Sequence, residues 1–401
     1  MSSYGLVGLG AIGQNLALNI QKKTDVHVYN RTPQKVNELM KRGLGIRGHE
    51  SLCEMISSME LPRTIITTLP SGETTDSVIR YMLKSLDPLD TVIDCSNEHY
   101  RVSRHRGAYL ATHSIRYIGA GLSGGAKGAL NGPALMLGCN KLTYDNNREF
   151  LETFCKNVTY MGNDFGAGHY TKMVHNGVEY GMLQGMADVY SYCNQDQICM
   201  SQLMNDTHGT DIDGFLMNAA VDVLKKFEIH EISDIAEMNH TGLWCSKVGM
   251  EYEIPTPIIN AALNTRMTSS YEKYLDTRQK TCIFYDRVVA LNTLRFIFAS
   301  SLLEGYDLMR TRSIDKDQVA KAWGLGTIIE CPMVSKDLYE VIDETVDDVR
   351  LFVMHCVKSG IPCPAVCAAL TQYDFKHQTR TSMNFLMAQR NYFGDHKVYE
   401  V

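Results

Sequence analysis

The chain has 401 residues, of which 44% are hydrophobic and 21% charged, and its formal net charge is −6. This composition is that of a globular protein, and the length predicts two or three domains. The acidic balance, without a basic tract, argues against a nucleic-acid partner, and no apolar run reaches the roughly 18 residues that indicate a membrane span. The start MSSYGLVGLG does not resemble a signal peptide, and the twelve cysteines are scattered without CxxC spacing. We expect a cytoplasmic protein with reduced thiols and without a metal site.

The first thirty residues predict a strand, a glycine-rich turn, a helix and a second strand. Tyr4–Leu9 and Val26–Asn30 are the expected strands, and Gln14–Lys22 is the expected helix. The turn has the GxGxxG pattern in the strand-to-helix setting that binds dinucleotides. Its glycines allow a tight turn, a close approach of pyrophosphate and close packing of the helix, whose N-terminus attracts phosphate. A glycine-rich turn without a ligand is the alternative. The predicted cofactor residues of the turn are Gly8, Gly10, Ala11, Ile12 and Gly13.

The end of the second strand indicates which cofactor is used. NAD sites normally have an acidic residue here for the ribose 2′-hydroxyl, whereas this chain has Asn30-Arg31-Thr32. Arg31 can pair with a 2′-phosphate, and no acid at this position repels one. We therefore expect NADP, the alternative being that Arg31 is an ordinary surface residue.

Further apolar strands continue the expected parallel sheet. Polar or glycine-rich segments follow them, where ligands bind in open α/β sheets: Pro70-Ser71-Gly72, Asn97 and Leu122–Gly128. The last of these offers backbone N–H groups and a hydroxyl to an anion, although it could equally be a plain loop. The strands expected here are Thr64–Leu69, Thr91–Cys95 and Tyr117–Gly121.

After about residue 165 the pattern becomes helical. The expected fold is an α/β doubly wound (Rossmann) domain over residues 1–165, followed by a large all-α domain over residues 166–401. The helical patterns cover 168–193, 211–227, 240–252, 256–273, 283–312, 315–322, 335–359 and 363–374.

One helix carries four polar residues on a single face. Lys172, His175, Asn176 and Glu179 fall at i, i+3, i+4 and i+7 within GHYTKMVHNGVEYGMLQG, surrounded by apolar residues. Polar groups in such a setting are costly to bury unless they contact each other or a ligand. The lysine and glutamate, two turns apart, form a possible acid/base pair. A solvated helix face is the alternative.

With these motifs the chain resembles the decarboxylating 6-phosphogluconate dehydrogenases, from residue 4 to about 398. The resemblance is carried by GLGAIGQNLALNI, VYNRTPQKV, GLSGGAKGALNGPALMLGC, GHYTKMVHNGVEYGMLQ and AQRNYFGDHKVYE. It implies an NADP-dependent oxidative decarboxylation of 6-phospho-D-gluconate to ribulose 5-phosphate and CO2, in the pentose phosphate pathway. It also implies a homodimer with shared active sites.

The resemblance implies a role for each matching residue. Lys172 resembles the base that takes the proton of the C3 hydroxyl, and Glu179 the acid that protonates the enediol; His175 and Asn176 complete the catalytic set. The implied cofactor positions beyond the turn are Asn30, Arg31, Thr32, Leu69, Pro70, Ser71 and Asn97. The implied substrate positions are Asn97, Ser123, Gly124, Gly125, His175, Asn176, Tyr180, Arg266, Arg390 and His396, the last two reaching into the partner subunit's site.

The chain also departs from the family pattern. Asn239 stands where the family has a phosphate-binding lysine, which removes one charge-assisted contact of about 1.5–3 kcal/mol; Lys247 is a candidate replacement. Cys95-Ser96 replaces a Gly-Gly pair, Leu69–Gly72 differs from the usual segment, and the family's long tail has no counterpart after His396. Two alternatives therefore stay open: a dehydrogenase for another β-hydroxy acid, and a non-catalytic relative that binds cofactor or sugar phosphate.

Overall fold

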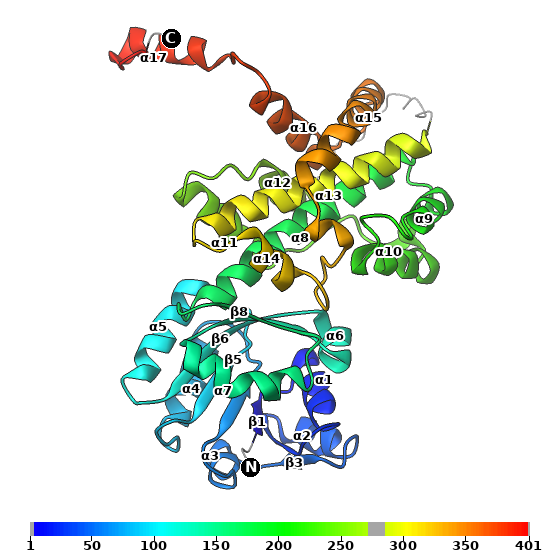
Figure 1. Cartoon of the computed structure of the whole chain (residues 1–401). Coiled ribbons are helices and arrows are strands. Elements are labelled where there is room, and N and C mark those ends of the chain that lie inside the picture. Colours follow the sequence, from blue (N-terminus) through cyan, green and yellow to red (C-terminus); the bar gives the residue numbers. More distant parts are fainter. Residues whose placement is uncertain (1–3, 272–284, 400–401) are drawn as a thin grey trace.

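The computed structural model describes residues 4–271 and 285–399. The first part of the chain forms one sheet of eight strands in the order β3-β2-β1-β4-β5-β6-β7-β8, covered by helices on both faces (Figure 1). Neighbouring strands are parallel except β6 and β7, which pair antiparallel. The strands are β1 (Tyr4–Val7), β2 (Val26–Tyr29), β3 (Ile46–Gly48), β4 (Thr64–Thr67), β5 (Thr91–Asp94), β6 (Arg116–Ser123), β7 (Ala134–Gly138) and β8 (Asn157–Gly162).

The strand order reverses beside β1, with β2 on one side and β4 on the other. The carboxyl ends of these parallel strands share one edge of the sheet, so the loops that follow them meet there. The helices of this part are α1 (Ala11–Ile20), α2 (Pro33–Met40), α3 (Leu52–Ser57), α4 (Glu73–Met82), α5 (Tyr100–Ala111), α6 (Gly125–Asn131) and α7 (Lys141–Glu152).

Helix α8 joins the sheet to the helical part of the chain. It packs against β6 and β7 near its start and against α11, α12 and α13 farther along (Figure 1). Because both surroundings are apolar, most of its 26 residues are buried. The helices from here on are α8 (Ala167–Tyr192), α9 (Gln197–Asp206), α10 (Phe215–Lys226), α11 (His240–Glu251), α12 (Pro257–Ser269), α13 (Arg287–Arg310), α14 (Lys316–Trp323), α15 (Leu338–Ser359), α16 (Pro364–Lys376) and α17 (Met383–Gly394), with short 3₁₀ turns at Ile229–Glu231 and Pro332–Ser335.

Helix α13 forms the centre of the helical part. Within residues 4–271 and 285–399 it is the one helix long and apolar enough to cross a membrane by length and composition, and 67% of that stretch is buried. It packs between α8 and α15. The burial is that of a core helix whose apolar surface is covered by its neighbours.

The predicted fold class, a Rossmann-like domain followed by a helical domain, is confirmed. The expectation of a wholly parallel sheet is wrong at β7. No ranges were predicted for β3, β7, β8, α2 to α7, α9 and α17. Their apolar runs are short, and hydrophobic periodicity gives neither the direction nor the partner of a strand. Helix α1 begins three residues before the predicted start because Gly10, in extended conformation, is already its N-cap. The ends of two predicted helices, 272–273 and 283–284, lie outside the described residues.

Candidate active site

A cavity of about 1000 Å³ lies at the carboxyl ends of β1, β2 and β4. This is the edge at which the strand order reverses and open α/β sheets bind ligands. Most of the predicted cofactor residues line it, whereas Ser71 and Asn97 do not. The predicted residues in the lining are Gly8, Gly10, Ala11, Ile12, Gly13, Asn30, Arg31, Thr32, Leu69 and Pro70.

The glycines of the turn have the conformations that a phosphate-binding turn requires. Gly8 has a φ of +99°, and a Cβ on Gly13 would lie 2.0 Å from the Gly8 carbonyl oxygen, so α1 can approach β1 only without that atom. A Cβ on Gly10 would meet nothing within 4 Å, which leaves the N-terminus of α1 open to a ligand. The Leu9 N–H donates to Asn30 Oδ1 at 2.9 Å and ties the turn to the end of β2. This arrangement fits a dinucleotide whose pyrophosphate lies at the N-terminus of α1.

Two cations line the cavity near the end of β2. Arg31 follows the strand directly, and Lys35 lies in the first turn of α2. A guanidinium and an ammonium at this place fit the 2′-phosphate that distinguishes NADP from NAD. Lys35 was missed in the sequence, although its i+4 spacing from Arg31 at the start of a helix could have identified it.

The polar face of α8 is buried at Lys172, His175 and Asn176 and internally hydrogen-bonded, which is one of the two alternatives that its spacing left open. Lys172 is 8% exposed and His175 is fully buried. Lys172 Nζ donates to Ser123 Oγ at 3.2 Å and lies 3.3 Å from His175 Nδ1. Ser123 Oγ is in turn 3.2 Å from His175 Nε2. Residues 49 and 52 positions apart thus form one cluster at the end of β6, which excludes the alternative of a solvated helix face.

Burial sets the protonation of this cluster. It lowers the pKa of Lys172 to about 8, against the opposing attraction of the Glu179 carboxylate. Burial and the neighbouring Lys172 ammonium lower the pKa of His175 well below its usual value. Burial also raises the pKa of Glu179, although Lys172 and Arg266 act in the opposite direction. A lysine that is partly neutral near pH 8 can act as a base, and a glutamate of raised pKa can act as an acid.

The glycine-rich segment at the end of β6 lies against the polar face of α8 through Ser123. Gly124 has a φ of +109°, and a Cβ there would lie 2.9 Å from the Gly326 carbonyl oxygen, so the close approach requires glycine. Gly125 begins α6, and Gly124 is its N-cap. The Ile328 N–H points to Ser123 Oγ at 3.4 Å, which brings the segment after α14 to the same place.

Farther along α8, polar contacts connect it to α11 and α12. Asn176 Nδ2 donates to Thr241 Oγ1 at 3.0 Å, and the Tyr180 hydroxyl donates to Asn239 Oδ1 at 3.2 Å. The Arg266 guanidinium lies 3.7 Å from the centroid of the Tyr180 ring, a cation–π contact. Asn239 is also the N-cap of α11, where its Oδ1 accepts from the Thr241 N–H. Thr241 was not among the predicted site residues.

Some predicted residues lie outside this cluster. Asn97 is exposed in the segment after β5, next to Ser96, whose carbonyl contacts α8. Arg390 and His396 are exposed on α17 and the segment after it, which project away from the rest of the chain (Figure 1). Lys247 is exposed on α11, just over two turns after Asn239.

Two family models together match almost the whole chain. The first, described as the NAD binding domain of 6-phosphogluconate dehydrogenase, matches residues 3–162. The second, described as the 6-phosphogluconate dehydrogenase C-terminal domain, matches residues 168–336 and 308–401. The chain belongs to the 6-phosphogluconate dehydrogenase family.

Individual members of this family are similar over their full length. The decarboxylating 6-phosphogluconate dehydrogenase of Staphylococcus epidermidis is 32% identical over 447 residues, covering 98% of this chain and 95% of the relative. That of Lactococcus lactis is 30% identical with the same coverage. The solved structure of Plasmodium falciparum 6-phosphogluconate dehydrogenase, studied as apoenzyme, with NADP+ and with 6-phosphogluconate, aligns with a TM-score of 0.89 at 27% identity, over 100% of this chain and 98% of that one.

Proposed function

We propose that this chain is an NADP-dependent decarboxylating 6-phosphogluconate dehydrogenase, which converts 6-phospho-D-gluconate to ribulose 5-phosphate and CO2. The observation that carries the proposal is the buried cluster of Lys172, Ser123 and His175, with Glu179 one turn beyond, in a chain of this family. A lysine that is partly neutral near pH 8 and a glutamate of raised pKa form the acid/base pair that such a reaction needs.

The first proton transfer belongs to Lys172. Its neutral amine accepts the proton of the C3 hydroxyl while the C3 hydrogen departs; bound NADP supplies the hydride acceptor. The resulting ammonium donates a hydrogen bond to the new C3 carbonyl oxygen, held in place by Ser123 and His175. This polarisation lets the ketone accept the electron pair of the bond between the carboxylate carbon and C2 as CO2 leaves, and Lys172 passes its proton to the C3 oxygen to give the enediol.

The second proton transfer belongs to Glu179. The enediol left after the loss of CO2 needs a proton on its terminal carbon, and Glu179 is the nearest acid of raised pKa on the same face of α8. Its Oε2 lies 3.8 Å from His175 Nδ1, so it is close to the cluster without being locked into it. As Glu179 donates, the C3 hydroxyl of the enediol returns its proton to Lys172, so the product is a ketone and the Lys172 ammonium stabilises the new Glu179 carboxylate.

The remaining site residues position the substrate and the cofactor. Gly124, Gly125, Asn97 and Asn176 offer hydrogen bonds to the carboxylate and hydroxyls, and Tyr180 with Arg266 forms the end that takes the phosphate. The cofactor lies in the cavity after β1, β2 and β4, with its 2′-phosphate on Arg31 and Lys35. We assign residues 1–165 to NADP binding and residues 166–401 to substrate binding and dimerisation, because β8 ends at Gly162 and α8 begins at Ala167.

The functional assembly in this proposal is a homodimer. Helix α17 and the segment after it expose large apolar side chains away from the rest of the chain, among them Phe385 (67% exposed), Tyr392 (92%) and Phe393 (74%). A second copy that covers them would receive Arg390 and His396 in its own site. We place the enzyme in the cytoplasm, although one relative, from Spinacia oleracea, is chloroplastic.

The test is NADPH formation by the purified protein with NADP and 6-phosphogluconate, beside NAD and unphosphorylated gluconate. The proposal predicts turnover with the phosphorylated substrate and a higher kcat/KM for NADP than for NAD. A preference for an unphosphorylated hydroxy acid would instead support a dehydrogenase for another β-hydroxy acid. This alternative is favoured by Asn239, which stands where the family has a phosphate-binding lysine. Saturable NADPH binding without any turnover would support a non-catalytic relative.

A further inference from the structure

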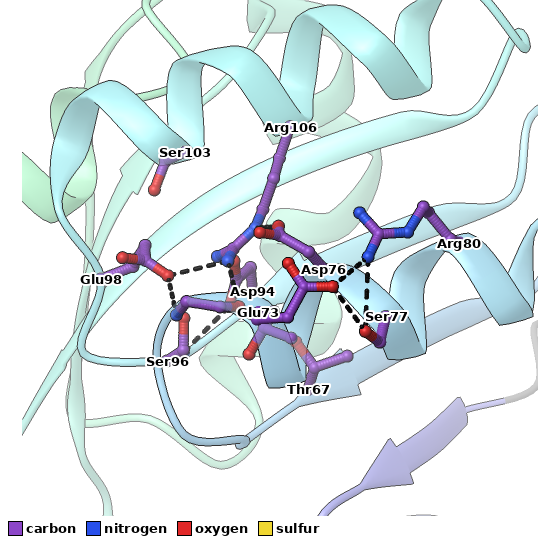
Figure 2. Close-up of polar contacts among 12 residues, drawn as sticks. Thr67, Glu73, Asp76, Ser77, Arg80, Asp94, Ser96, Glu98, Ser103 and Arg106 are labelled. Atoms are coloured by element: carbon purple, nitrogen blue, oxygen red, sulfur yellow. Dashed lines mark hydrogen bonds and ion pairs between the residues drawn. The ribbon is translucent and has the colours of Figure 1, made fainter.

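A buried arginine outside the cluster of Lys172 connects the loops around the cofactor cavity. Arg106, in α5, is 5% exposed and faces three carboxylates (Figure 2). Its Nε lies 2.6 Å from Asp76 Oδ1, its Nη1 2.9 Å from Asp94 Oδ2 and its Nη2 2.8 Å from Glu98 Oε2. One guanidinium among three carboxylates is an expensive arrangement to bury, and buried ion pairs add little net stability. Such a cluster serves the fold mainly by fixing the conformation of the backbone segments that it contacts.

The ion-pair cluster around Arg106 fixes the conformation of the loop after β4. The Gly72 N–H donates to Glu98 Oε2 at 2.7 Å, and the Gly72 carbonyl accepts from Arg106 Nη2 at 3.1 Å. Both backbone polar groups of Gly72 are therefore held by the same ion pair. Leu69 and Pro70, just before it, line the cofactor cavity.

The same cluster also fixes the conformation of the segment after β5. Asp94 Oδ1 accepts from the Ser96 N–H at 3.0 Å, and Glu98 Oε1 accepts from the His99 N–H at 2.9 Å. The residue between, Asn97, is exposed at the predicted place of the substrate. The carboxylates that bind Arg106 thus also shape the backbone on both sides of Asn97.

The same cluster reaches the start of α8. His169 Nε2 lies 3.0 Å from the Ser96 carbonyl oxygen, and its Nδ1 lies 2.5 Å from Ser103 Oγ on α5. His169 stands three residues before Lys172, one helical turn away. The loop at the cofactor cavity, the segment of Asn97 and the helix of Lys172 are therefore connected through contacts that begin at Arg106.

We propose that Arg106 and Glu98 are positioning residues, which hold the cofactor loop Leu69–Gly72 in register with Asn97 and Lys172. This inference rests on the proposed function, because it assigns the cofactor and the substrate to the two sides of the network. Neither side chain lines the cofactor cavity, so their effect on turnover is through the backbone that they hold.

The deciding variant is Glu98→Gln, which preserves shape but removes the charge and replaces one carboxylate oxygen with an NH2 group. The single remaining oxygen cannot accept both from Gly72 and Arg106 on one side and from His99 on the other. We expect the KM for NADP to rise on the order of tenfold, the factor that corresponds to one charge-assisted hydrogen bond. Arg106→Lys, which keeps the charge but loses the planar set of N–H donors, should also raise the KM for NADP. The matched control is Arg104→Gln, which removes a guanidinium from the same helix where it forms an ion pair with half-buried Asp164.

Two readouts separate positioning from mere support of the fold. A structural role would lower the melting temperature and the fraction of active enzyme, with the KM for NADP unchanged; positioning raises that KM at an unchanged concentration of active sites. Hydrogen exchange should show faster exchange of the Gly72 amide in Glu98→Gln than in the wild type. An unchanged KM, or an equally protected Gly72 amide, would overturn the proposal.

These readouts also distinguish this proposal from the proposed function. If the wild type binds NADPH but does not turn over 6-phosphogluconate, the proposed reaction fails, and the positioning role is then judged by NADPH affinity. A tenfold weaker NADPH affinity in Glu98→Gln, with Arg104→Gln unchanged, would support positioning of the cofactor loop in that case. Equal affinities in all three proteins would refute it.

Discussion

Replacing Lys172 with methionine tests the assigned base. Methionine has a similar length and no charge, and the site is 8% exposed, so it fits without a new cavity. General-base catalysis contributes about 10²–10⁴-fold, and Lys172→Met should lower kcat by at least that factor. Lys172 is not part of the cofactor-cavity lining, so NADPH affinity should stay within about twofold of the wild type.

The same substitution should not destabilise the fold. Burial lowers the pKa of Lys172 from 10.5 to about 8, which corresponds to about 3 kcal/mol against keeping the ammonium buried. This cost is fully present below pH 8 and decreases as the pH rises toward 10.5, because the folded protein then binds fewer protons than the unfolded chain. At pH 7 the variant should unfold at the same or a higher denaturant concentration than the wild type.

The assay is NADPH formation under saturating substrates, with NADPH binding followed by fluorescence in the same preparations. Lys141→Met, an exposed lysine at the start of α7, is the control and should keep wild-type turnover. In the wild type, kcat/KM should fall as the pH drops below 8, by up to about tenfold per pH unit, since only neutral Lys172 accepts a proton. Turnover of Lys172→Met above about a tenth of wild type, or a flat pH profile, would refute the assignment of the base.

Three further predictions concern other parts of the chain. Asn239→Lys should lower the KM for 6-phosphogluconate by placing a second cation beside Arg266, at the cost of about 1 kcal/mol for the lost N-cap of α11; an unchanged KM would show that this position does not face the phosphate. Hybrid dimers co-expressed from Lys172→Met and Arg390→Ala chains should regain activity that neither parent has, because one of their two sites is intact; inactive hybrids would contradict shared sites. Burial raises the pKa of Glu304 from 4.5 to about 8, so the folded protein holds a proton that the unfolded chain releases, and stability should fall as the pH rises across this range. Glu304→Gln should flatten that slope by up to about 1.4 kcal/mol per pH unit in denaturant titrations, and an unaltered slope would argue against the buried carboxyl as its source.

Local patterns were sufficient for the features that depend on nearby residues. The glycine turn from Gly8 to Gly13 and the polar face from Lys172 to Glu179 are each contained within one element, so spacing alone predicts their geometry. The contact of Lys172 with Ser123 joins residues 49 positions apart. Spacing cannot give such a contact, and the resemblance to a family assigned both residues to the site without predicting that they touch.

The network of Arg106 shows what the sequence could not give. Helix α5 contains Arg101, Arg104 and Arg106 within six residues, and nothing local distinguishes the buried one from the two that form exposed or half-exposed pairs. Which arginine points inward depends on how α5 lies over β5 and β6. Likewise, neither the strand β7 nor its antiparallel direction was predicted, because that direction follows from its pairing with β6.

The central claim is that oxidation at C3 is followed by loss of the carboxylate within the same site. It is tested most directly with 6-phosphogluconate labelled with ¹³C at C1, by measuring labelled CO2 against NADPH formed. The account predicts one labelled CO2 for each NADPH, and neither product from Lys172→Met. NADPH formed without labelled CO2 would contradict it and would identify a dehydrogenase that does not decarboxylate its substrate.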